Sequence, residues 1–190
     1  LSLAGGRQDQ YAATFGGVNY MEFYDNDKVI VNPLRIRPQY MHELENNLVL
    51  YFTSTSRESA GIIKEQVKNV SGKNEKSIEA MHQLKEQARM MKEALLKGKL
   101  NEIGEILDYG FQQKRMMAAN ISTPLIEQIY DAAKKAGATG GKISGAGGGG
   151  FMIFYCPGNT RHQVAESLTK LGGSVQPYQF TLSGIRSWST

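Results

Sequence analysis

The run Lys142-Ile143-Ser144-Gly145-Ala146-Gly147-Gly148-Gly149-Gly150-Phe151 carries the strongest structural signal in the chain. The six residues before Phe151 are five glycines and one alanine. Glycine allows bends that residues with a Cβ rarely adopt, and successive uncovered backbone amides form a concavity that accepts an anion. The apolar residues from Phe151 to Cys156 predict a buried strand directly after the glycines. The run is therefore either a tight turn between two strands or an anion-binding loop.

The spacing Gly145-x-Gly147-x-x-Gly150 also matches the glycine pattern of dinucleotide-binding loops. That pattern requires a strand before the loop and a helix after it. Here a strand follows the loop, so the match is weak. For the glycine run taken alone, a turn between two strands is the favoured interpretation.

Length and composition indicate a globular protein. The chain has 190 residues, enough for one domain or two small ones. Hydrophobic residues make up 41% and charged residues 21% of it. The net charge is +4, but Lys and Arg are interleaved with Asp and Glu, so no nucleic-acid surface is predicted. A small positive balance suits an anionic ligand such as a nucleotide or a sugar phosphate.

Cys156 is the only cysteine and lies in an apolar run. An intrachain disulfide is therefore excluded, and a reducing compartment, the cytoplasm, is expected. No signal peptide and no run of about 18 apolar residues is present, so the sequence predicts neither secretion nor a membrane partner. Because the chain starts at Leu1 rather than at methionine, we expect it to be trimmed or to be the later part of a longer polypeptide.

Hydrophobic periodicity and turn residues predict an α+β fold. Strands followed by helix pairs, ending in a β-α-β unit, indicate a mostly antiparallel sheet with helices on one face. Pro33 and Pro38 are expected to punctuate an irregular crossing segment. The expected strands are residues 18–24, 29–31, 48–52, 151–156, 175–182 and 185–188, and the expected helices are residues 7–15, 59–69, 75–97, 100–117, 124–136 and 157–171.

Few residues in the sequence point to catalysis. The three histidines, His42, His82 and His162, are far apart and have no cysteine or carboxylate at ligand spacing, so no metal site is predicted. The phosphate loop of P-loop enzymes, the serine nucleophile elbow and the protein-kinase motifs are all missing. What remains is Asp9, between glycine joints, together with the glycine loop. Taken alone, Asp9 is more often a helix cap than a base.

Taken together, the two stretches resemble motifs of the GHMP kinases, the family that includes galactokinase, homoserine kinase and mevalonate kinase. Residues 142–150 match the third motif of that family, and residues 5–17 are similar to the second motif in its sugar-kinase form. Within the family the chain is most similar to the kinases of D-glycero-α-D-manno-heptose 7-phosphate. This closer similarity rests on Gln8-Asp9-Gln10-Tyr11, on Tyr51-Phe52-Thr53 leading to Arg57-Glu58-Ser59, and on Pro177-Tyr178-Gln179-Phe180 with residues 184–188.

The resemblance implies an ATP-dependent sugar kinase that phosphorylates the anomeric hydroxyl of a heptose 7-phosphate or a similar sugar. By resemblance, Asp9 is the catalytic base or orienting group for that hydroxyl, and an ordinary aspartate is ionised at neutral pH. Arg7 is a second catalytic candidate, although a structural ion pair explains it better. The other candidates are Ser144, Gly145, Ala146, Gly147, Gly148 and Gly149 for the nucleotide phosphates, and Asp9, Gln8, Arg57 and Gly147 for the substrate. Lys142 is expected to anchor the loop.

The first motif of the family, a glycine-serine loop that wraps the ATP phosphates, is missing from the sequence, and the ligand for Mg²⁺ is expected upstream with it. The resemblance therefore implies the end of an N-terminal lobe over residues 1–37 and a ferredoxin-like C-terminal GHMP kinase domain over residues 38–190. On this reading the chain is catalytically incomplete alone, and the missing N-terminal half is its partner. The alternatives are a stand-alone anion- or nucleotide-binding module and a dimerising α+β module; the sequence does not specify the oligomeric state.

Overall fold

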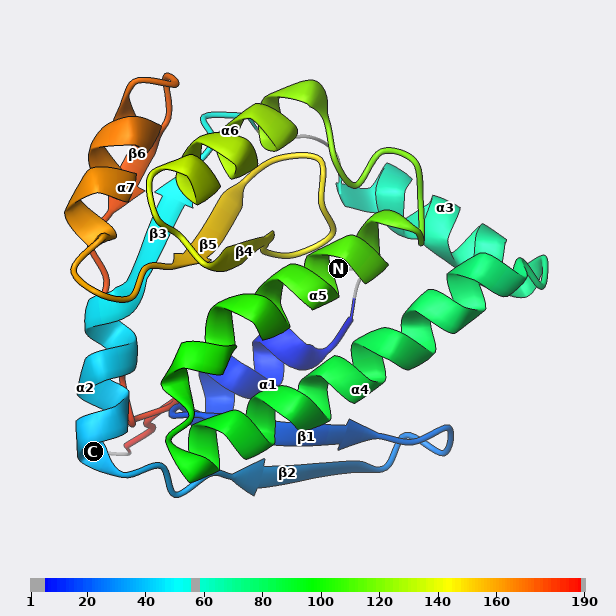
Figure 1. Cartoon of the computed structure of the whole chain (residues 1–190). Helices are drawn as coiled ribbons and strands as arrows, with labels where there is room; N and C mark the ends of the chain where they lie inside the picture. The colour runs from blue at the N-terminus through cyan, green and yellow to red at the C-terminus, as the bar shows by residue number, and fades with distance from the viewer. Residues whose placement is uncertain (1–5, 56–58, 189–190) are drawn as a thin grey trace.

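The computed structural model describes residues 6–55 and 59–188, and it forms an α+β fold with two antiparallel sheets (Figure 1). One sheet has two strands and the other has four. The elements in chain order are α1 (Gln8–Phe15), β1 (Asn19–Phe23), β2 (Val29–Pro33), α2 (Pro38–Asn47), β3 (Leu48–Phe52), α3 (Ser59–Ser71), α4 (Glu75–Lys97), a 3₁₀ turn (Leu100–Glu102), α5 (Ile103–Arg115), α6 (Pro124–Lys135), β4 (Gly140–Ile143), β5 (Phe151–Tyr155), α7 (Arg161–Thr169) and β6 (Ser174–Gln176).

The larger sheet has the strand order β4-β5-β3-β6, and every neighbouring pair is antiparallel. Ile143 of β4 faces Met152 of β5 in the register, and Lys142 faces Ile153. Because side chains alternate along a strand, these two pairs point to opposite faces of the sheet. Ile143 and Met152 are fully buried in the main core, so Lys142 points to the other face.

Helices α6 and α7 cover the face to which Ile143 points (Figure 1). Thr123 caps α6 by accepting a hydrogen bond from the amide of Ile126, and Pro124 occupies the first helical position. The apolar side of α6 then packs on the sheet, where the rings of Tyr130 and Phe154 lie 6.1 Å apart. Helix α5 lies along β4, so it reaches the edge of the sheet from which the glycine loop starts.

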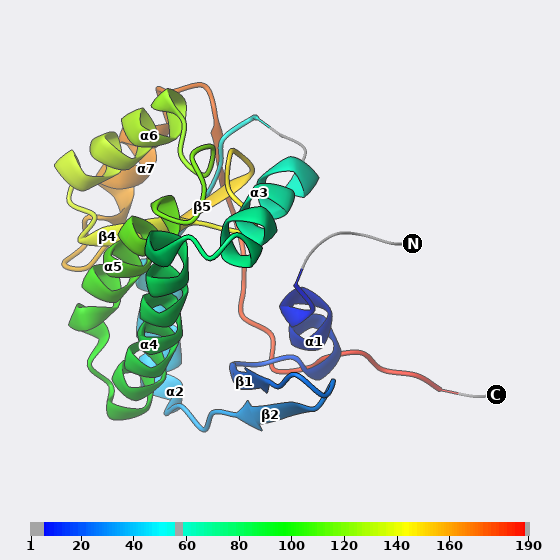
Figure 2. The same cartoon turned by 90° about the vertical axis from the view of Figure 1, so that its right-hand side faces the viewer.

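Helix α1 and the β1–β2 hairpin lie to one side of this body (Figure 2). The ring of Tyr11 in α1 packs edge-on against Phe23 of β1, with 5.8 Å between centroids. On the other side of the hairpin, the ammonium group of Lys92 in α4 lies 4.2 Å from the ring centroid of Tyr20. These contacts fix where α1 sits relative to the sheet and the helices.

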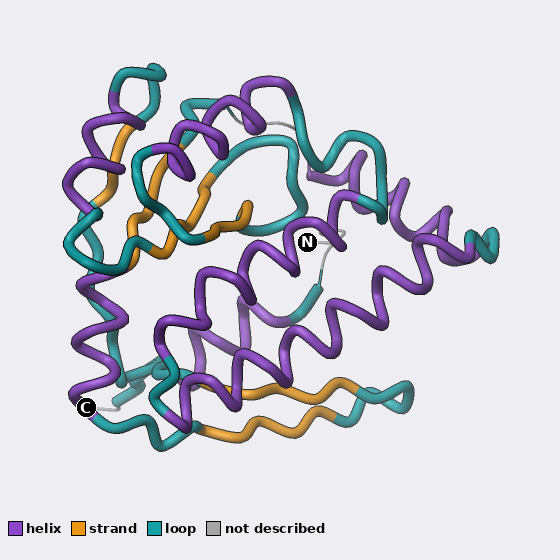
Figure 3. Tube along the Cα trace, viewed as in Figure 1, coloured by secondary structure: helices purple, strands orange, loops and turns teal. Residues whose placement is uncertain are grey.

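The last segment of the chain differs from its prediction. Residues 175–182 and 185–188 were expected to be strands, but pairing in the sheet ends at Gln176, and the segment continues without regular structure (Figure 3). Pro177 has no N–H to donate to a ladder. The segment instead runs to α1, where the amide of Gly17 donates to Thr181 O at 2.8 Å and the amide of Ile185 donates to Thr14 O at 3.0 Å.

The segment crosses α1 so closely that both backbones need glycine. A Cβ on Gly184 would lie 2.0 Å from the carbonyl oxygen of Thr14, and a Cβ on Gly16 would lie 2.3 Å from the amide nitrogen of Gly184. Gly16 also has a φ of +65°, which residues with a side chain rarely adopt. The C-terminal segment therefore works as a strap that ties α1 to the larger sheet.

A second difference lies at Pro38. A crossing segment was expected there and no helix was predicted, whereas Pro38 begins α2, with proline at the first helical position. The other expected elements are confirmed, with shifts of a few residues at their ends. In the part of the chain that the structure describes, no helix combines the length and the hydropathy needed to cross a lipid bilayer.

Candidate functional site

The glycine loop is closed at both ends by backbone hydrogen bonds. The amide of Ser144 donates to Phe151 O at 2.8 Å, which continues the β4–β5 ladder. On the other side, Gly150 accepts from the amide of Thr53 at 2.9 Å and donates to Thr55 O at 2.8 Å. Thr53 and Thr55, which follow β3, therefore border the loop.

The middle of the loop rests on the segment before α6. The amide of Gly148 donates to Ile121 O at 2.8 Å. Gly147 has a φ of +117°, and a Cβ there would lie 2.9 Å from the Cα of Ile121. Glycine is required at this position both by the backbone conformation and by the closeness of a neighbouring backbone.

Four amides of the loop have no hydrogen-bond acceptor within the described part of the protein. Among the described residues, the amides of Gly145, Ala146, Gly147 and Gly149 donate to no protein acceptor, whereas those of Ser144, Gly148 and Gly150 do. Uncovered amides that follow one another along a bent backbone form an anion-binding concavity. The anion-binding loop predicted from the sequence included Gly148. The N–H of Gly148 already donates to Ile121 O, so fewer amides are left for an anion than predicted.

Asp9 lies in the first turn of α1, whose N-cap is Arg7, so Asp9 is not the cap residue. Its side chain is exposed. A negative charge in the first turn interacts favourably with the helix dipole. The carboxylate also interacts with Lys142: burial lowers the pKa of the Lys142 ammonium, and the negative charge of Asp9 opposes that shift. Asp9 therefore lies near enough to Lys142, in the strand before the glycine loop, for their charges to interact.

A second lysine, Lys114 near the end of α5, lies beside the loop. Its Nζ donates a hydrogen bond to the carbonyl of Gly145. Burial, with the positive charge of Lys142 as a smaller cause, lowers the pKa of Lys114 to about 8. Lys114 was not predicted from the sequence. Lys142 was expected to anchor the loop, whereas Lys114 hydrogen-bonds to the loop backbone.

The remaining candidate residues lie in different settings. Arg7 forms an exposed ion pair with Asp27 in the hairpin turn, at 2.9 Å, as a structural role requires. Gln8 is the exposed first residue of α1, and Ser144 is exposed at the start of the loop. Arg57 lies outside the described residues. The catalytic and binding roles expected for these residues stay predictions.

A network of polar side chains joins α5 to α6 behind the loop. Arg115 forms an ion pair with Glu127 at 2.8 Å, and its guanidinium lies 4.1 Å from the ring centroid of Phe111. Glu127 also accepts a hydrogen bond from the hydroxyl of Ser122, next to the segment that supports Gly148. This network fixes the segment around Ile121, which accepts the hydrogen bond from Gly148.

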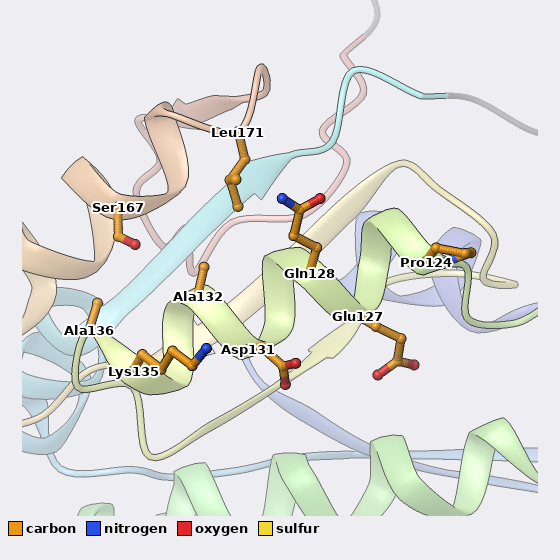
Figure 4. A pocket seen from close by; sticks show the side chains of 9 residues that line it. All are labelled: Pro124, Glu127, Gln128, Asp131, Ala132, Lys135, Ala136, Ser167 and Leu171. Carbon is orange, nitrogen blue, oxygen red and sulfur yellow. The ribbon is translucent and has the colours of Figure 1, made fainter.

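A large surface depression lies elsewhere. It has a volume of about 770 Å³ and runs between α6 and α7 (Figure 4). Its lining comprises Pro124, Glu127, Gln128, Asp131, Ala132, Lys135, Ala136, Ser167 and Leu171. It is open to solvent and includes no residue of the glycine loop and neither Asp9 nor Lys142. We therefore place the candidate site at the loop.

Comparison with known proteins bears on the family. Residues 91–173 match the family model described as the C-terminal domain of GHMP kinases. The chain is 46% identical over 188 residues to D-glycero-alpha-D-manno-heptose 7-phosphate kinase from Campylobacter jejuni, covering 99% of this chain and 55% of that protein.

Solved structures agree with this result. A crystal structure of a sugar kinase from Campylobacter jejuni superposes with a TM-score of 0.72 at 43% identity, covering 99% of this chain and 52% of that one. A D-glycero-D-manno-heptose 1-phosphate kinase from Bacteroides thetaiotaomicron gives a TM-score of 0.69 at 38% identity, covering 98% and 51%. The chain spans about half the length of these relatives. Residues 91–173 therefore match a GHMP kinase C-terminal domain, and the chain is similar to heptose phosphate kinases over almost its whole length.

Proposed function

We propose that this chain supplies part of an ATP-dependent sugar kinase that phosphorylates the anomeric hydroxyl of a heptose 7-phosphate or a closely similar sugar. The observation that supports the proposal is the charge interaction between Asp9 and Lys142, because it requires the carboxylate to lie near the strand that leads into the glycine loop. The similarity to a heptose 7-phosphate kinase over almost the whole chain supports the choice of substrate.

The proposed mechanism divides the reaction between the two sides of the site. Asp9 accepts or orients the proton of the attacking hydroxyl, and the uncovered amides of Gly145, Ala146, Gly147 and Gly149 stabilise phosphate oxygens. Phosphoryl transfer depends mainly on positioning and on stabilising spread negative charge, so amides fixed in a rigid loop suit it. Arg7 is held by Asp27 and contributes in this proposal by fixing the start of α1.

ATP is expected to act with Mg²⁺. Within residues 6–55 and 59–188, no group of three His, Cys, Asp or Glu side chains is placed to hold a metal ion. We propose that the ligands of Mg²⁺ come from outside these residues. We keep the cytoplasm as the proposed compartment, because the single thiol, Cys156, is buried and free.

The test is a transfer assay with the full-length protein, ATP-Mg²⁺ and D-glycero-α-D-manno-heptose 7-phosphate. We expect a bisphosphate with its new phosphate on the anomeric carbon, identified by ³¹P NMR. Sugars without the 7-phosphate serve as comparison substrates. No transfer to any sugar would contradict the proposed function, whereas tight, stoichiometric binding of ATP-Mg²⁺ by these 190 residues alone, measured by calorimetry, would favour a self-standing nucleotide-binding module.

A further inference from the structure

Two lysines from different elements meet beside the glycine loop. Lys114 comes from the last turn of α5, and Lys142 comes from β4, two residues before Ser144. Helix α5 packs along β4, so the two side chains approach the same end of the loop. The Nζ of Lys114 reaches the carbonyl of Gly145, the first residue of the glycine run.

Both ammonium groups are only partly exposed, and they lie close enough for their charges to repel. Among the described residues, no carboxylate lies within ion-pair distance of either one; the carboxylate of Asp9 acts on Lys142 from farther away. Bringing two like charges together in a partly desolvated position is unfavourable. The arrangement is relieved when an anion binds between them.

We propose that Lys114 and Lys142 form a subsite for a dianionic phosphoryl group, bordered by the uncovered amides of Gly145 and Ala146 and facing Asp9. The inference rests on the proposed kinase function. It adds two positively charged side chains to an anion site that was so far described only by its backbone amides. At neutral pH a phosphate monoester carries close to two negative charges, which matches two ammonium groups.

The geometry favours a phosphate over a carboxylate as the occupant. Lysine binds phosphate as a point charge with rotatable donors, and adjacent backbone amides supply further donors to a tetrahedral anion. A ligand there also raises the pKa of both lysines, because a neighbouring negative charge favours the charged form of an amine. The phosphate can come from the sugar phosphate or from the terminal phosphate of the nucleotide.

The first test measures steady-state kinetics of the full-length protein carrying Lys114→Gln or Lys142→Gln. A charge-assisted hydrogen bond supports an increase of about tenfold or more in the KM of the substrate whose phosphate occupies the subsite. An increase for the sugar phosphate assigns the subsite to the acceptor, and an increase for ATP assigns it to the nucleotide. Lys85→Gln, on the exposed side of α4, is the matched control and should leave both constants unchanged.

Lys114 also supports the loop, so a structural role must be separated from binding. Lys114→Arg keeps the charge and should recover most of the affinity. If Lys114→Gln lowers thermal stability or kcat while both KM values stay at the wild-type level, the subsite is refuted, and the same holds if Lys142→Gln changes neither KM.

A second test uses the unmodified protein and does not depend on turnover. An amine-reactive reagent is applied at pH 8 with and without inorganic phosphate or ATP, and labelled lysines are identified by peptide mass spectrometry. We expect phosphate to slow labelling of Lys114 and Lys142 severalfold but not that of Lys85. Equal labelling with and without the anions would overturn the inference. If the anions protect both lysines in a protein that shows no kinase activity, the subsite is supported and the proposed kinase function is not.

Discussion

The carboxylate of Asp9 and the ammonium group of Lys142 act on each other although one lies at the beginning of the chain and the other in its last quarter. The charge of Asp9 raises the pKa of Lys142 against the larger lowering caused by burial. Asp9 is placed by α1, which packs on the β1–β2 hairpin, and Lys142 by the alternation of β4. The packing of these two elements therefore brings the two sequence motifs near enough for their charges to interact.

Replacing Asp9 with asparagine tests its proposed role as base. We expect kcat of the full-length protein to fall by about a hundredfold or more, the usual contribution of a positioned general base. The affinity for ATP should stay the same, because the nucleotide is proposed to contact the loop amides. Kinetics combined with calorimetric ATP binding measures both quantities.

Asp25→Asn, in the exposed turn of the hairpin, is the control for this change and should be silent. Full turnover in Asp9→Asn would remove the base assignment.

Alanine at Gly147 should destabilise the loop more than alanine at Gly150. Both glycines have positive φ, so both substitutions cost backbone strain on the order of 1–3 kcal/mol. A Cβ at position 147 also meets the backbone of Ile121, whereas nothing lies within 4 Å of a Cβ at position 150. Urea unfolding of the two variants measures the difference, and an equal loss in both would show that the close approach to Ile121 is not important.

Alanine at Gly184 should release α1 from the strap. The added Cβ would lie 2.0 Å from Thr14 O, so the crossing has to open and the hydrogen bond from Ile185 to Thr14 is lost. Hydrogen exchange should show faster exchange of the amides of Gly17 and Ile185, with little change in α6. Gly61→Ala, at an exposed position of α3 with open space around it, is the control. Unchanged protection in Gly184→Ala would contradict the role of the strap.

The pKa of Lys114 predicts how stability depends on pH. Its folded pKa is about 8, below the ordinary value of 10.5, so between these values the unfolded chain binds more protons than the folded one. The free energy of unfolding contributed by Lys114 should therefore rise with pH from about 8 to 10.5, and the burial cost is present in full below that window. The positive charge of Lys142 also lowers the pKa of Lys114, and the negative charge of Asp9 acts on Lys142.

Urea unfolding of the wild type and of Lys114→Met from pH 7 to pH 10 measures the contribution of Lys114 to the free energy of unfolding. The difference between the two proteins should shift in favour of the wild type as the pH rises. A difference independent of pH would show that the ammonium group of Lys114 is not buried.

Local patterns predicted most of the fold. The helix Glu75–Lys97 and the strand Phe151–Tyr155 follow directly from hydrophobic periodicity and flanking glycines. Helix α2 was missed because only Leu44 and Asn47 in it are buried, which leaves little periodic pattern. The C-terminal strands were predicted wrongly. Apolar and polar residues alternate there as in a strand, but Pro177 ends the hydrogen-bonded pairing of β6 with β3.

The site could be predicted only in part. Asp9 and the glycine loop were proposed as site residues through their similarity to family motifs, and their roles stay predictions. Lys114 was not found, because a lysine followed by Arg115 in the last turn of a helix is common where cations complement the helix dipole. Its position beside Gly145 depends on how α5 packs along β4, and no local pattern encodes that contact.

The central claim, that Asp9 and the strand leading into the glycine loop share one site, is tested most directly by titrating Lys142. NMR of lysine side chains labelled at Cε or Nζ, with Lys142→Gln used to assign the resonance, gives its pKa in the wild type and in Asp9→Asn. The account predicts that the pKa of Lys142 falls when Asp9 loses its charge, while the pKa of Lys85 does not move. An identical pKa of Lys142 in the two proteins would contradict it.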